Sequence, residues 1–457
     1  DIGTQSARAL LVDPDGRIVD VVQSKYAEPY FSKEPGWAEQ KPNFYFDRLC
    51  ECCRELCARS NALLPDVIAM TITVIRDTVV CLDANNEPLR DIILWLDKRT
   101  VDPNGAMPAK NMMLFKVAGM EPTAKVVYAA SVGNWIMRHE PEIWARTAKY
   151  VMLPTYLNYK LTGNLIDSAS NQIGHIPFDY KNRRWMKPGS LTRCFCDVPN
   201  EKLCDLVPSG TVIGTITDEV CALTGIPAGL PLISTGSDKG CETLGLAVMD
   251  SDKASISLGT TATIQFSTTE YVEPQQFLPS YPSVINKAWN PEIQVFRGFW
   301  MLNWFIKEFA DKDKAEAQEM GISPEELLNR RAAEVPAGCN GLMLQPYWTP
   351  DVLKPDSYGA IIGFSDYHTK YHIYRAIIEG ICLELYMSMK AMERRGKKHI
   401  EEIFVGGGGS KSDLACQILA DTFGLPVKRI HTHEACSIGA AMVAFVAKGE
   451  FASYDAA

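Results

Sequence analysis

An unbroken run of four glycines constrains the fold of this chain more than any other feature. Residues 406–409 are all glycine; they follow an apolar strand pattern at 403–405 and precede Ser410, Lys411 and Ser412. Glycine loses more conformational freedom on folding than any other residue, so such a run indicates that bare backbone is needed at this strand-to-helix junction. Backbone amides at such a junction bind anions. Because the Lys and Ser positions do not fit the GxxxxGK spacing of a P-loop, a different phosphate-binding turn is predicted.

Two further turns combine a glycine with small hydroxyl residues. They are Asp1-Ile-Gly3-Thr4-Gln-Ser6-Ala-Arg8 and Gly259-Thr260-Thr261. The amides and hydroxyls of such turns can donate to phosphate oxygens, and the Asp1 carboxylate can hold Mg²⁺ directly or through water. A Gly-Thr pair after a strand is most often only a turn. Its appearance early in each half of the chain predicts a duplicated domain with one phosphate-facing turn from each copy.

The length and the periodicity of the chain predict a two-domain α/β protein. A chain of 457 residues is too long for one compact core. Strand patterns alternate with helical patterns, which is typical of α/β architecture. The clearest elements are a hairpin at 9–12 and 18–22, helices at 42–63, 131–139, 154–162 and 372–395, and strands at 66–81, 92–95, 232–234, 254–267 and 403–405. A polar segment at 249–253 places the domain break near 245–253.

An acidic residue stands where a buried strand passes into a helix. Asp238 follows Gly236 and Ser237, directly after the apolar strand pattern at 232–234. An Asp in this position can accept a proton from a substrate hydroxyl. It can equally be a helix cap, and the spacing alone does not decide between the two.

Several polar and aromatic residues are candidates for contact with a hydroxylated substrate. Arg76 can donate a fork of hydrogen bonds and Asp77 can accept, which suits adjacent hydroxyls; an exposed ion pair is the alternative. Trp95 offers a flat apolar face but can also be a core residue. Lys239 either contacts the substrate or pairs with a nearby carboxylate.

Composition excludes several other classes of protein. The chain is 46% hydrophobic and 22% charged, with a formal net charge of −9 and no basic run. Nucleic acid and anionic membrane are therefore not expected as partners. No stretch approaches the ~18–20 apolar residues of a membrane-spanning helix, and no signal peptide is visible, so a cytoplasmic location is expected. The start at Asp1, without Met, also predicts that natural sequence precedes it.

The fourteen cysteines are scattered rather than arranged as a disulfide framework. The densest group, Cys50, Cys52, Cys53 and Cys57, falls largely on the apolar stripe of the helix predicted at 42–63. No CxxC pair and no paired histidines accompany it, as a zinc site would require. Core packing is therefore expected. A metal-binding redox protein is the alternative that these thiols leave open.

Taken together, the motifs resemble those of the FGGY carbohydrate kinases, which belong to the actin-like, ribonuclease-H-like ATPase superfamily. The resemblance runs from the first residue to Ala444. It is carried by the turns described above and by Gly36-Trp-Ala-Glu39-Gln40, Ile93-Leu-Trp95-Leu-Asp97-Lys-Arg99, Tyr156-Leu-Asn-Tyr-Lys-Leu-Thr-Gly163, Gly359-Ala-Ile-Ile-Gly363-Phe364 with His372 to Glu379, Gln417 with Ala420-Asp421, and Gly439-Ala-Ala441. Two positions depart from the pattern: Phe364 replaces a smaller aliphatic residue, and Val132 stands where many members carry Lys.

The resemblance implies two ribonuclease-H-like domains with a catalytic cleft between them. It implies an N-terminal sugar-binding domain at 1–248, a C-terminal ATP-binding domain at 249–457, and the cofactors ATP and Mg²⁺. Asp238 falls on the position of the catalytic general base and Asp1 on that of the metal-site acid. The nucleotide-contact positions are Thr4, Ser6, Arg8, Gly259, Thr260, Asn303, Gly407, Gly408 and Ser412. The substrate positions are Arg76, Asp77, Trp95, Asp238 and Lys239.

The expected activity is phosphorylation of a hydroxyl on a small sugar or polyol, either a ketopentose such as xylulose or a glycerol-like polyol. A non-catalytic ATP-binding sensor or scaffold of the same superfamily is the alternative. The partner is expected to be a small molecule, and a homodimer is left open.

Overall fold

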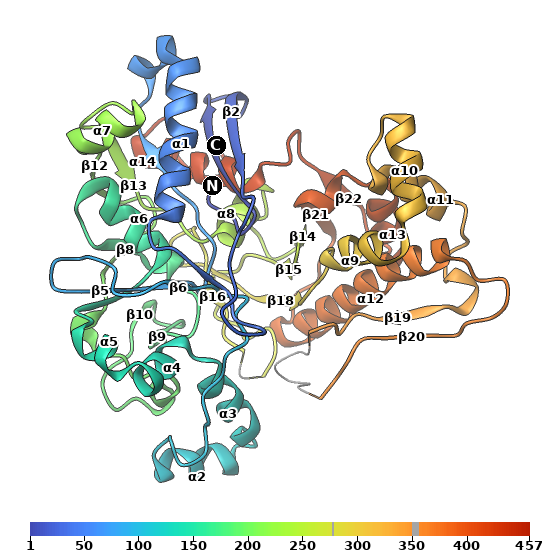
Figure 1. Ribbon diagram of the computed structural model, residues 1–457, viewed down its shortest axis with the longest axis horizontal. Coiled ribbons are helices and arrows are strands. Elements are labelled where there is room, and N and C mark those ends of the chain that lie inside the picture. The colour runs from blue at the N-terminus through green and yellow to red at the C-terminus, as the bar shows by residue number, and fades with distance from the viewer. Residues whose placement is uncertain (277, 350–355) are drawn as a thin grey trace. The chain divides into compact units, whose positions relative to one another are not determined.

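The computed structural model describes residues 1–276, 278–349 and 356–457. The chain forms two compact units (Figure 1). The first unit comprises Asp1–Gly245, Tyr281–Lys287 and Cys436–Ala457; the second comprises Leu246–Ser280 and Ala288–Ala435. The first passage between units, at Gly245 and Leu246, falls within the predicted break at 245–253. The division into a sugar-binding part at 1–248 and an ATP-binding part at 249–457 stays a prediction.

The first unit contains several small sheets and most of the short helices. Its strands are β1 (Ser6–Val12), β2 (Ile18–Lys25), β3 (Glu39–Gln40), β4 (Met70–Thr71), β5 (Val79–Leu82), β6 (Ile92–Ile93), β7 (Lys149–Met152), β8 (Ile166–Ser168), β9 (Phe178–Asp179), β10 (Arg184–Trp185), β11 (Asp205–Val207), β12 (Val212–Thr215), β13 (Pro231–Ile233) and β16 (Tyr281–Pro282). Its helices are α1 (Phe44–Arg59), α2 (Ala109–Val117), α3 (Glu121–Ala130), α4 (Val132–His139), α5 (Pro141–Arg146), α6 (Leu153–Thr162), α7 (Asp218–Thr224), α8 (Asp238–Gly245) and α14 (Ala435–Lys448).

The predicted hairpin is confirmed as the antiparallel pair β1 and β2, against which α1 packs. Helix α1 is shorter than the predicted 42–63. It ends at Arg59, and residues Asn61–Asp66 continue as a 3₁₀ helix containing Pro65. Proline lacks the amide hydrogen that an α-helix needs in its interior, which accounts for the change.

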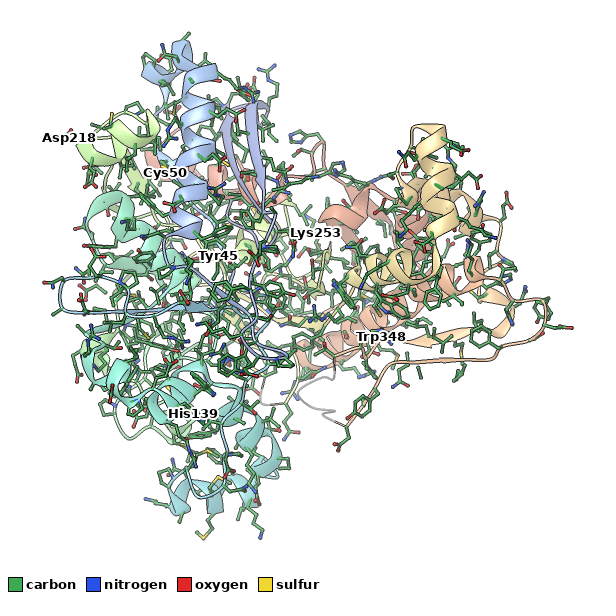
Figure 2. The ribbon with its side chains drawn as sticks, in the orientation of Figure 1. Tyr45, Cys50, His139, Asp218, Lys253 and Trp348 are labelled. Carbon is green, nitrogen blue, oxygen red and sulfur yellow. The ribbon has the colours of Figure 1, made fainter. Side chains whose placement is uncertain are left out.

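The cysteine-rich stripe belongs to the core, as predicted. Tyr45 and Cys50 lie on α1 (Figure 2), and Tyr45 is fully buried. Cys50, Cys52, Cys53 and Cys57 are all buried and free, in one cluster with the apolar residues of the first unit. Burial raises the pKa of the Cys50 thiol to about 11, which keeps it neutral. These thiols therefore act as small apolar side chains.

The second unit is built on one five-stranded sheet. The strands of this unit, inside and outside that sheet, are β14 (Lys253–Leu258), β15 (Ala262–Gln265), β17 (Trp289–Asn290), β18 (Glu292–Val295), β19 (Met343–Gln345), β20 (Ala360–Ile362), β21 (Glu402–Gly406) and β22 (Val427–Arg429). Its helices are α9 (Trp300–Phe309), α10 (Asp311–Met320), α11 (Pro324–Ala333), α12 (Lys370–Gly396) and α13 (Asp413–Phe423). The sheet order is β18-β15-β14-β21-β22, in which β14, β21 and β22 run parallel to one another.

The long helix α12 packs against β15 and β18 on one side and against α9, α11 and α13 elsewhere (Figure 1). It covers the whole of the helical segment predicted at 372–395 as one helix. Within the described ranges, no helix is long and apolar enough to cross a membrane.

Candidate functional site

The two Gly-Thr turns have the same strand environment, each in its own unit. In the first unit, Ile2 bridges Ala7 in an antiparallel sense and Val74 in a parallel sense. In the second, β14 pairs with β15 in an antiparallel sense and with β21 in a parallel sense, so that Gly259 and Thr260 form the turn after Leu258. The similarity between the two halves therefore includes the pairing of the strands around the Gly-Thr turns as well as the Gly-Thr sequence itself.

Parallel pairing gathers the substrate candidates at one edge of the first unit. Strands β4 and β13 run parallel, so the chain segments that leave their carboxyl ends emerge at the same edge. Arg76 and Asp77 follow β4, and Asp238 follows β13. The amide of Asp238 donates to the carbonyl of Val74 at 3.2 Å, which ties the two segments together.

The hydroxyl that caps the start of α8 belongs to Ser237, the residue before Asp238. The hydroxyl of Ser237 accepts from the amide of Gly240 at 3.3 Å, which is the capping geometry at the start of α8. Asp238 Oδ1 accepts from the amide of Lys239 at 2.8 Å and lies 3.7 Å from Arg76 Nε. The side chain of Asp238 is 24% exposed, so the carboxylate remains accessible.

Asp77 is held by a residue that the sequence did not single out. His175 donates to Asp77 twice: from its backbone amide to Oδ1 at 2.9 Å, and through the contact between Nδ1 and Oδ2 at 2.7 Å. Burial acts to raise the pKa of Asp77, but His175 and Arg76 outweigh it and leave that pKa below its ordinary value. The only signal in the sequence is Gly174 beside the histidine.

Trp95 and Thr4 meet directly. The indole Nε1 of Trp95 donates to the Thr4 hydroxyl at 3.0 Å, and the backbone amide of Trp95 donates to the hydroxyl of Thr78 at 3.3 Å. Thr78 in turn donates to the carbonyl of Arg76 at 3.2 Å. The tryptophan is thus joined both to the first Gly-Thr turn and to the Arg76 segment.

The remaining residues of the first turn form a polar pair. Arg8 Nη1 lies 3.1 Å from Asp1 Oδ2, and Ser6 is buried on β1. No cluster of three or more His, Cys, Asp or Glu residues suited to a metal occurs among residues 1–276, 278–349 and 356–457. Mg²⁺ is commonly bound through one or two carboxylates together with phosphates and water, so a single acid such as Asp1 fits this ion.

Lys239 pairs with a carboxylate on its own helix. Its Nζ lies 2.8 Å from Oε2 of Glu242, one turn along α8. Burial lowers the pKa of Lys239, but the carboxylates of Glu242 and Asp238 outweigh that effect and leave it raised. The ammonium is therefore charged at neutral pH. A role in substrate binding stays a prediction.

The nucleotide candidates of the second unit also gather at one sheet edge. Ser257 is paired with Gly406 in the parallel ladder, so the Gly259 turn and the glycine run both follow carboxyl ends of neighbouring strands. A Cβ at Gly409 would lie 2.5 Å from Phe299 Cδ1 and 2.8 Å from Leu258 Cβ. Gly407 has φ +76°, and a Cβ on it would lie 3.0 Å from the carbonyl carbon of Leu258. Two of the four glycines are thus required for the loop to pack on β14.

Other residues of this loop are open or act as a cap. Gly408 and Thr260 are exposed, and a Cβ at Gly408 would meet no atom within 4 Å. The hydroxyl of Ser412 accepts from the amide of Ala415 at 3.1 Å and caps α13. Asn303 is exposed on α9, whose N-terminal end is tied to the turn because Phe299 donates from its amide to Gly259 at 3.0 Å. The loop therefore offers free backbone at its exposed glycine.

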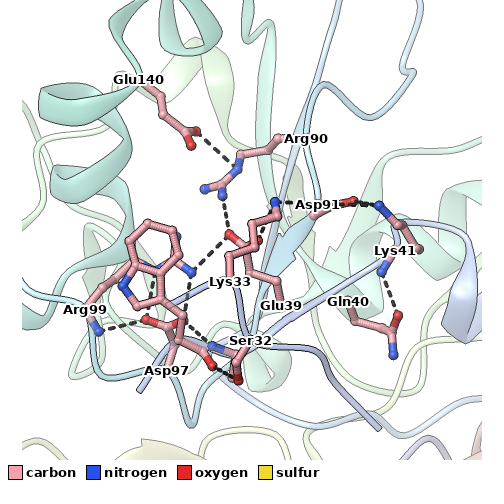
Figure 3. Close-up of polar contacts among 12 residues, drawn as sticks. Ser32, Lys33, Glu39, Gln40, Lys41, Arg90, Asp91, Asp97, Arg99 and Glu140 are labelled. Atoms are coloured by element: carbon pink, nitrogen blue, oxygen red, sulfur yellow. Dashed lines mark hydrogen bonds and ion pairs between the residues drawn. The ribbon is translucent and has the colours of Figure 1, made fainter. Parts of the chain in front are cut away.

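Two of the family-like motifs build the interior of the first unit. Figure 3 shows Glu39 surrounded by Lys33, Arg90 and Arg99. Arg99 Nη2 lies 3.0 Å from Glu39 Oε1, and Arg99 Nε lies 2.8 Å from Asp97 Oδ1. The guanidinium also lies over the ring of Trp37 at 3.8 Å. All three charged side chains are at least 98% buried, which makes this network a structural element.

The fold of the two units defines the class of protein. It is the two-domain α/β fold of the actin-like, ribonuclease-H-like kind, as predicted. The chain superposes on xylulose kinase from Lactobacillus acidophilus with a TM-score of 0.80 at 22% identity, over 99% of this chain and 89% of that one. It superposes on Plasmodium falciparum glycerol kinase with ADP with a TM-score of 0.78 at 19% identity, over 99% and 90% of the two chains.

The sequence identifies the family. Residues 1–245 match the N-terminal domain, and residues 254–448 the C-terminal domain, of the FGGY family of carbohydrate kinases. The chain belongs to this family, and it is an ATP-dependent sugar kinase. An uncharacterized sugar kinase of Escherichia coli, YgcE, is 28% identical over 100% of this chain and 85% of its own length. Xylulose kinase of Bacillus subtilis is 26% identical, over 100% and 89%, and gluconokinase of Bacillus licheniformis is 24% identical, over 100% and 88%.

Proposed function

We propose that this kinase phosphorylates a neutral polyol or ketose, of which a ketopentose such as xylulose and a glycerol-like polyol are the leading examples, with Asp238 as the general base. The observation that carries the proposal is the edge shared by β4 and β13. There Asp238 lies within 3.7 Å of Arg76, with its carboxylate accessible and the helix capped by Ser237 instead.

The balance of charge at this edge supports a neutral substrate. Arg76 faces Asp238, His175 faces Asp77, and Lys239 faces Glu242. A sugar acid such as gluconate would bring a further negative charge to an edge whose cations already face carboxylates, and burying an unpaired charge is unfavourable. A xylulose-like or glycerol-like substrate needs only donors and acceptors for its hydroxyls, which Arg76 and Asp77 supply.

The reaction follows from the chemistry of these side chains. Asp238 accepts the proton of the attacking hydroxyl while that oxygen attacks the γ-phosphorus of ATP, and ADP leaves. The exposed amides of the glycine loop and the Gly259 turn would donate to the phosphates in the second unit, and Thr4, Ser6 and Arg8 would do so in the first. Asp1 would hold Mg²⁺, which when bound neutralises negative charge on the phosphates.

A coupled assay of ADP formation against a panel of sugars tests this function. The panel contains D-xylulose, glycerol, other neutral ketoses and polyols, and gluconate as the acidic member. We expect ADP formation to require a neutral member of the panel. Strict dependence on gluconate would contradict the neutral class. Binding of ATP without sugar-dependent turnover on any member would favour the sensor or scaffold instead.

A further inference from the structure

None of the sequence motifs described above pointed to the contact between His175 and Asp77. It lies at the edge where the sugar is expected to bind. The two residues are 98 positions apart, and their side chains are 31% and 26% exposed. The accessible edge of each side chain allows a bound molecule to reach it. The rest of each side chain is enclosed, which fixes its orientation.

The backbone around the pair is shaped for the contact. Asp77 has φ +47°, an uncommon conformation for a residue with a side chain, and its amide donates to the carbonyl of Ile173 at 3.1 Å. Gly174 has φ +150°, and a Cβ on it would lie 2.2 Å from Asp77 Oδ1. The hydroxyl of Tyr180 accepts from the amide of Gly174 and donates to its carbonyl. Such strained local geometry is found where a side chain must be held in one place.

The chemistry of the pair fixes its protons. A carboxylate only accepts, so the 2.7 Å contact requires the proton to be on Nδ1 of His175. Burial lowers the pKa of His175, but the charge of Asp77 and its hydrogen bond outweigh that effect and leave the pKa raised. The imidazole therefore remains an imidazolium to higher pH than an ordinary histidine does.

Other charged and titratable groups lie around the pair. They are Arg76, Tyr150, Tyr180 and Cys196, with Tyr281 and Asp238 reached through Arg76. Burial raises the pKa of Cys196 to about 12 and holds the pKa of both Tyr150 and Tyr180 above the ordinary value. Arg76 stays charged throughout. Among these neighbours of Asp77, His175 is the group expected to change charge near neutral pH.

We propose that His175 is a positioning residue for sugar recognition, which holds Asp77 as the acceptor for a hydroxyl of a neutral sugar or polyol. One oxygen of the Asp77 carboxylate accepts from the backbone amide of His175 and the other accepts from its imidazolium. These two bonds fix the orientation of the carboxylate, so its remaining lone pairs can accept from a sugar hydroxyl. This inference rests on the proposed function, because it assumes that the sugar binds beside Arg76 and Asp77.

Two variants of His175 test the inference in the enzyme, with D-xylulose and glycerol as probes. His175→Ala removes the imidazolium donor, whose charged hydrogen bond corresponds to roughly a 10- to 100-fold effect on affinity. We expect the sugar KM to rise by that factor and the ATP KM to change less than about twofold. In His175→Asn the amide nitrogen can occupy the place of Nδ1, so the sugar KM should return to within about fivefold of wild type.

The matched control is His399→Asn. His399 also contacts a carboxylate, with Nδ1 at 3.1 Å from Glu393 Oε1, but it is 71% exposed in the second unit. Its replacement should leave both KM values unchanged.

The sugar KM of the wild-type enzyme should rise roughly fivefold as pH rises through the raised pKa of His175, because a neutral donor makes a weaker hydrogen bond than a charged one. In His175→Asn that rise should disappear.

The outcomes separate this inference from the proposed function. If Arg76→Ala raises the sugar KM and His175→Ala does not, the inference is wrong and the substrate site stands. If neither variant changes the sugar KM, the proposed site and the inference both fail.

NMR titration of labelled histidine tests the contact between His175 and Asp77 without any turnover. His175 should titrate above the ordinary value of about 6.5 and shift down in Asp77→Asn. If the pKa of His175 is ordinary and does not change in Asp77→Asn, the inference is wrong.

Discussion

Replacing Asp238 by Asn tests the assignment of the general base. Asparagine is nearly the same shape as aspartate but does not accept a proton from a hydroxyl. A positioned general base contributes typically about 10²- to 10⁴-fold to a rate, which corresponds to roughly 3–5 kcal/mol in the barrier. We therefore expect kcat for the best neutral sugar to fall by about that factor.

The structure also predicts what Asp238→Asn leaves intact. Ser237 caps α8, and the contact between Asp238 and Arg76 is 3.7 Å long with side chains 24% and 15% exposed, so the loss of stability should stay below about 1 kcal/mol. ATP affinity, measured by calorimetry, should be close to wild type. The assay is coupled ADP formation at saturating sugar and ATP. A variant that is folded and retains kcat within about threefold of wild type would refute the assignment of Asp238.

Three further substitutions test the sugar edge, the glycine loop and the buried network. Arg76→Ala should raise the sugar KM roughly 10- to 100-fold with little change in the ATP KM, because the variant lacks the hydrogen bonds from Arg76 to substrate hydroxyls. Equal increases in the sugar KM and the ATP KM, measured by steady-state kinetics, would contradict a sugar contact. Gly409→Ala places a Cβ 2.5 Å from Phe299 Cδ1, so it should lower thermal stability by about 1–3 kcal/mol and weaken ATP binding. Gly408→Ala, which meets no atom within 4 Å, should be as stable as wild type, and equal stability of the two variants would contradict the packing. Arg99→Ala leaves Glu39 and Asp97 buried without this partner and should cost about 3–5 kcal/mol in denaturant unfolding. Arg17→Ala, at a site 71% exposed, should leave the denaturation midpoint close to wild type; similar losses in the two variants would argue against a structural network.

The sequence predicted the parts of the fold that short-range patterns encode. The glycine run, the two Gly-Thr turns and the acid after β13 are each defined by neighbouring residues, and the structure places each at the carboxyl end of a strand or strand-like segment. The end of α1 at Arg59 was missed because Pro65 acts within a segment that otherwise continues the apolar pattern.

The long-range contacts were not predictable from spacing. His175 reaches Asp77 across 98 residues, and its own neighbourhood carries no motif. Likewise, Glu39 and Arg99 are 60 positions apart, and nothing local indicates that they share one buried network. For Lys239, the sequence left two readings open; the structure adds its contact with Glu242 one helical turn away. Tertiary structure decides such contacts because the partners come from separate elements.

A structure of the enzyme with its neutral sugar bound tests the central claim most directly. The account predicts a sugar hydroxyl about 2.6–3.2 Å from the carboxylate of Asp238, with neighbouring hydroxyls bonded to Arg76 and Asp77. A productive sugar bound where it contacts none of these three residues would contradict it.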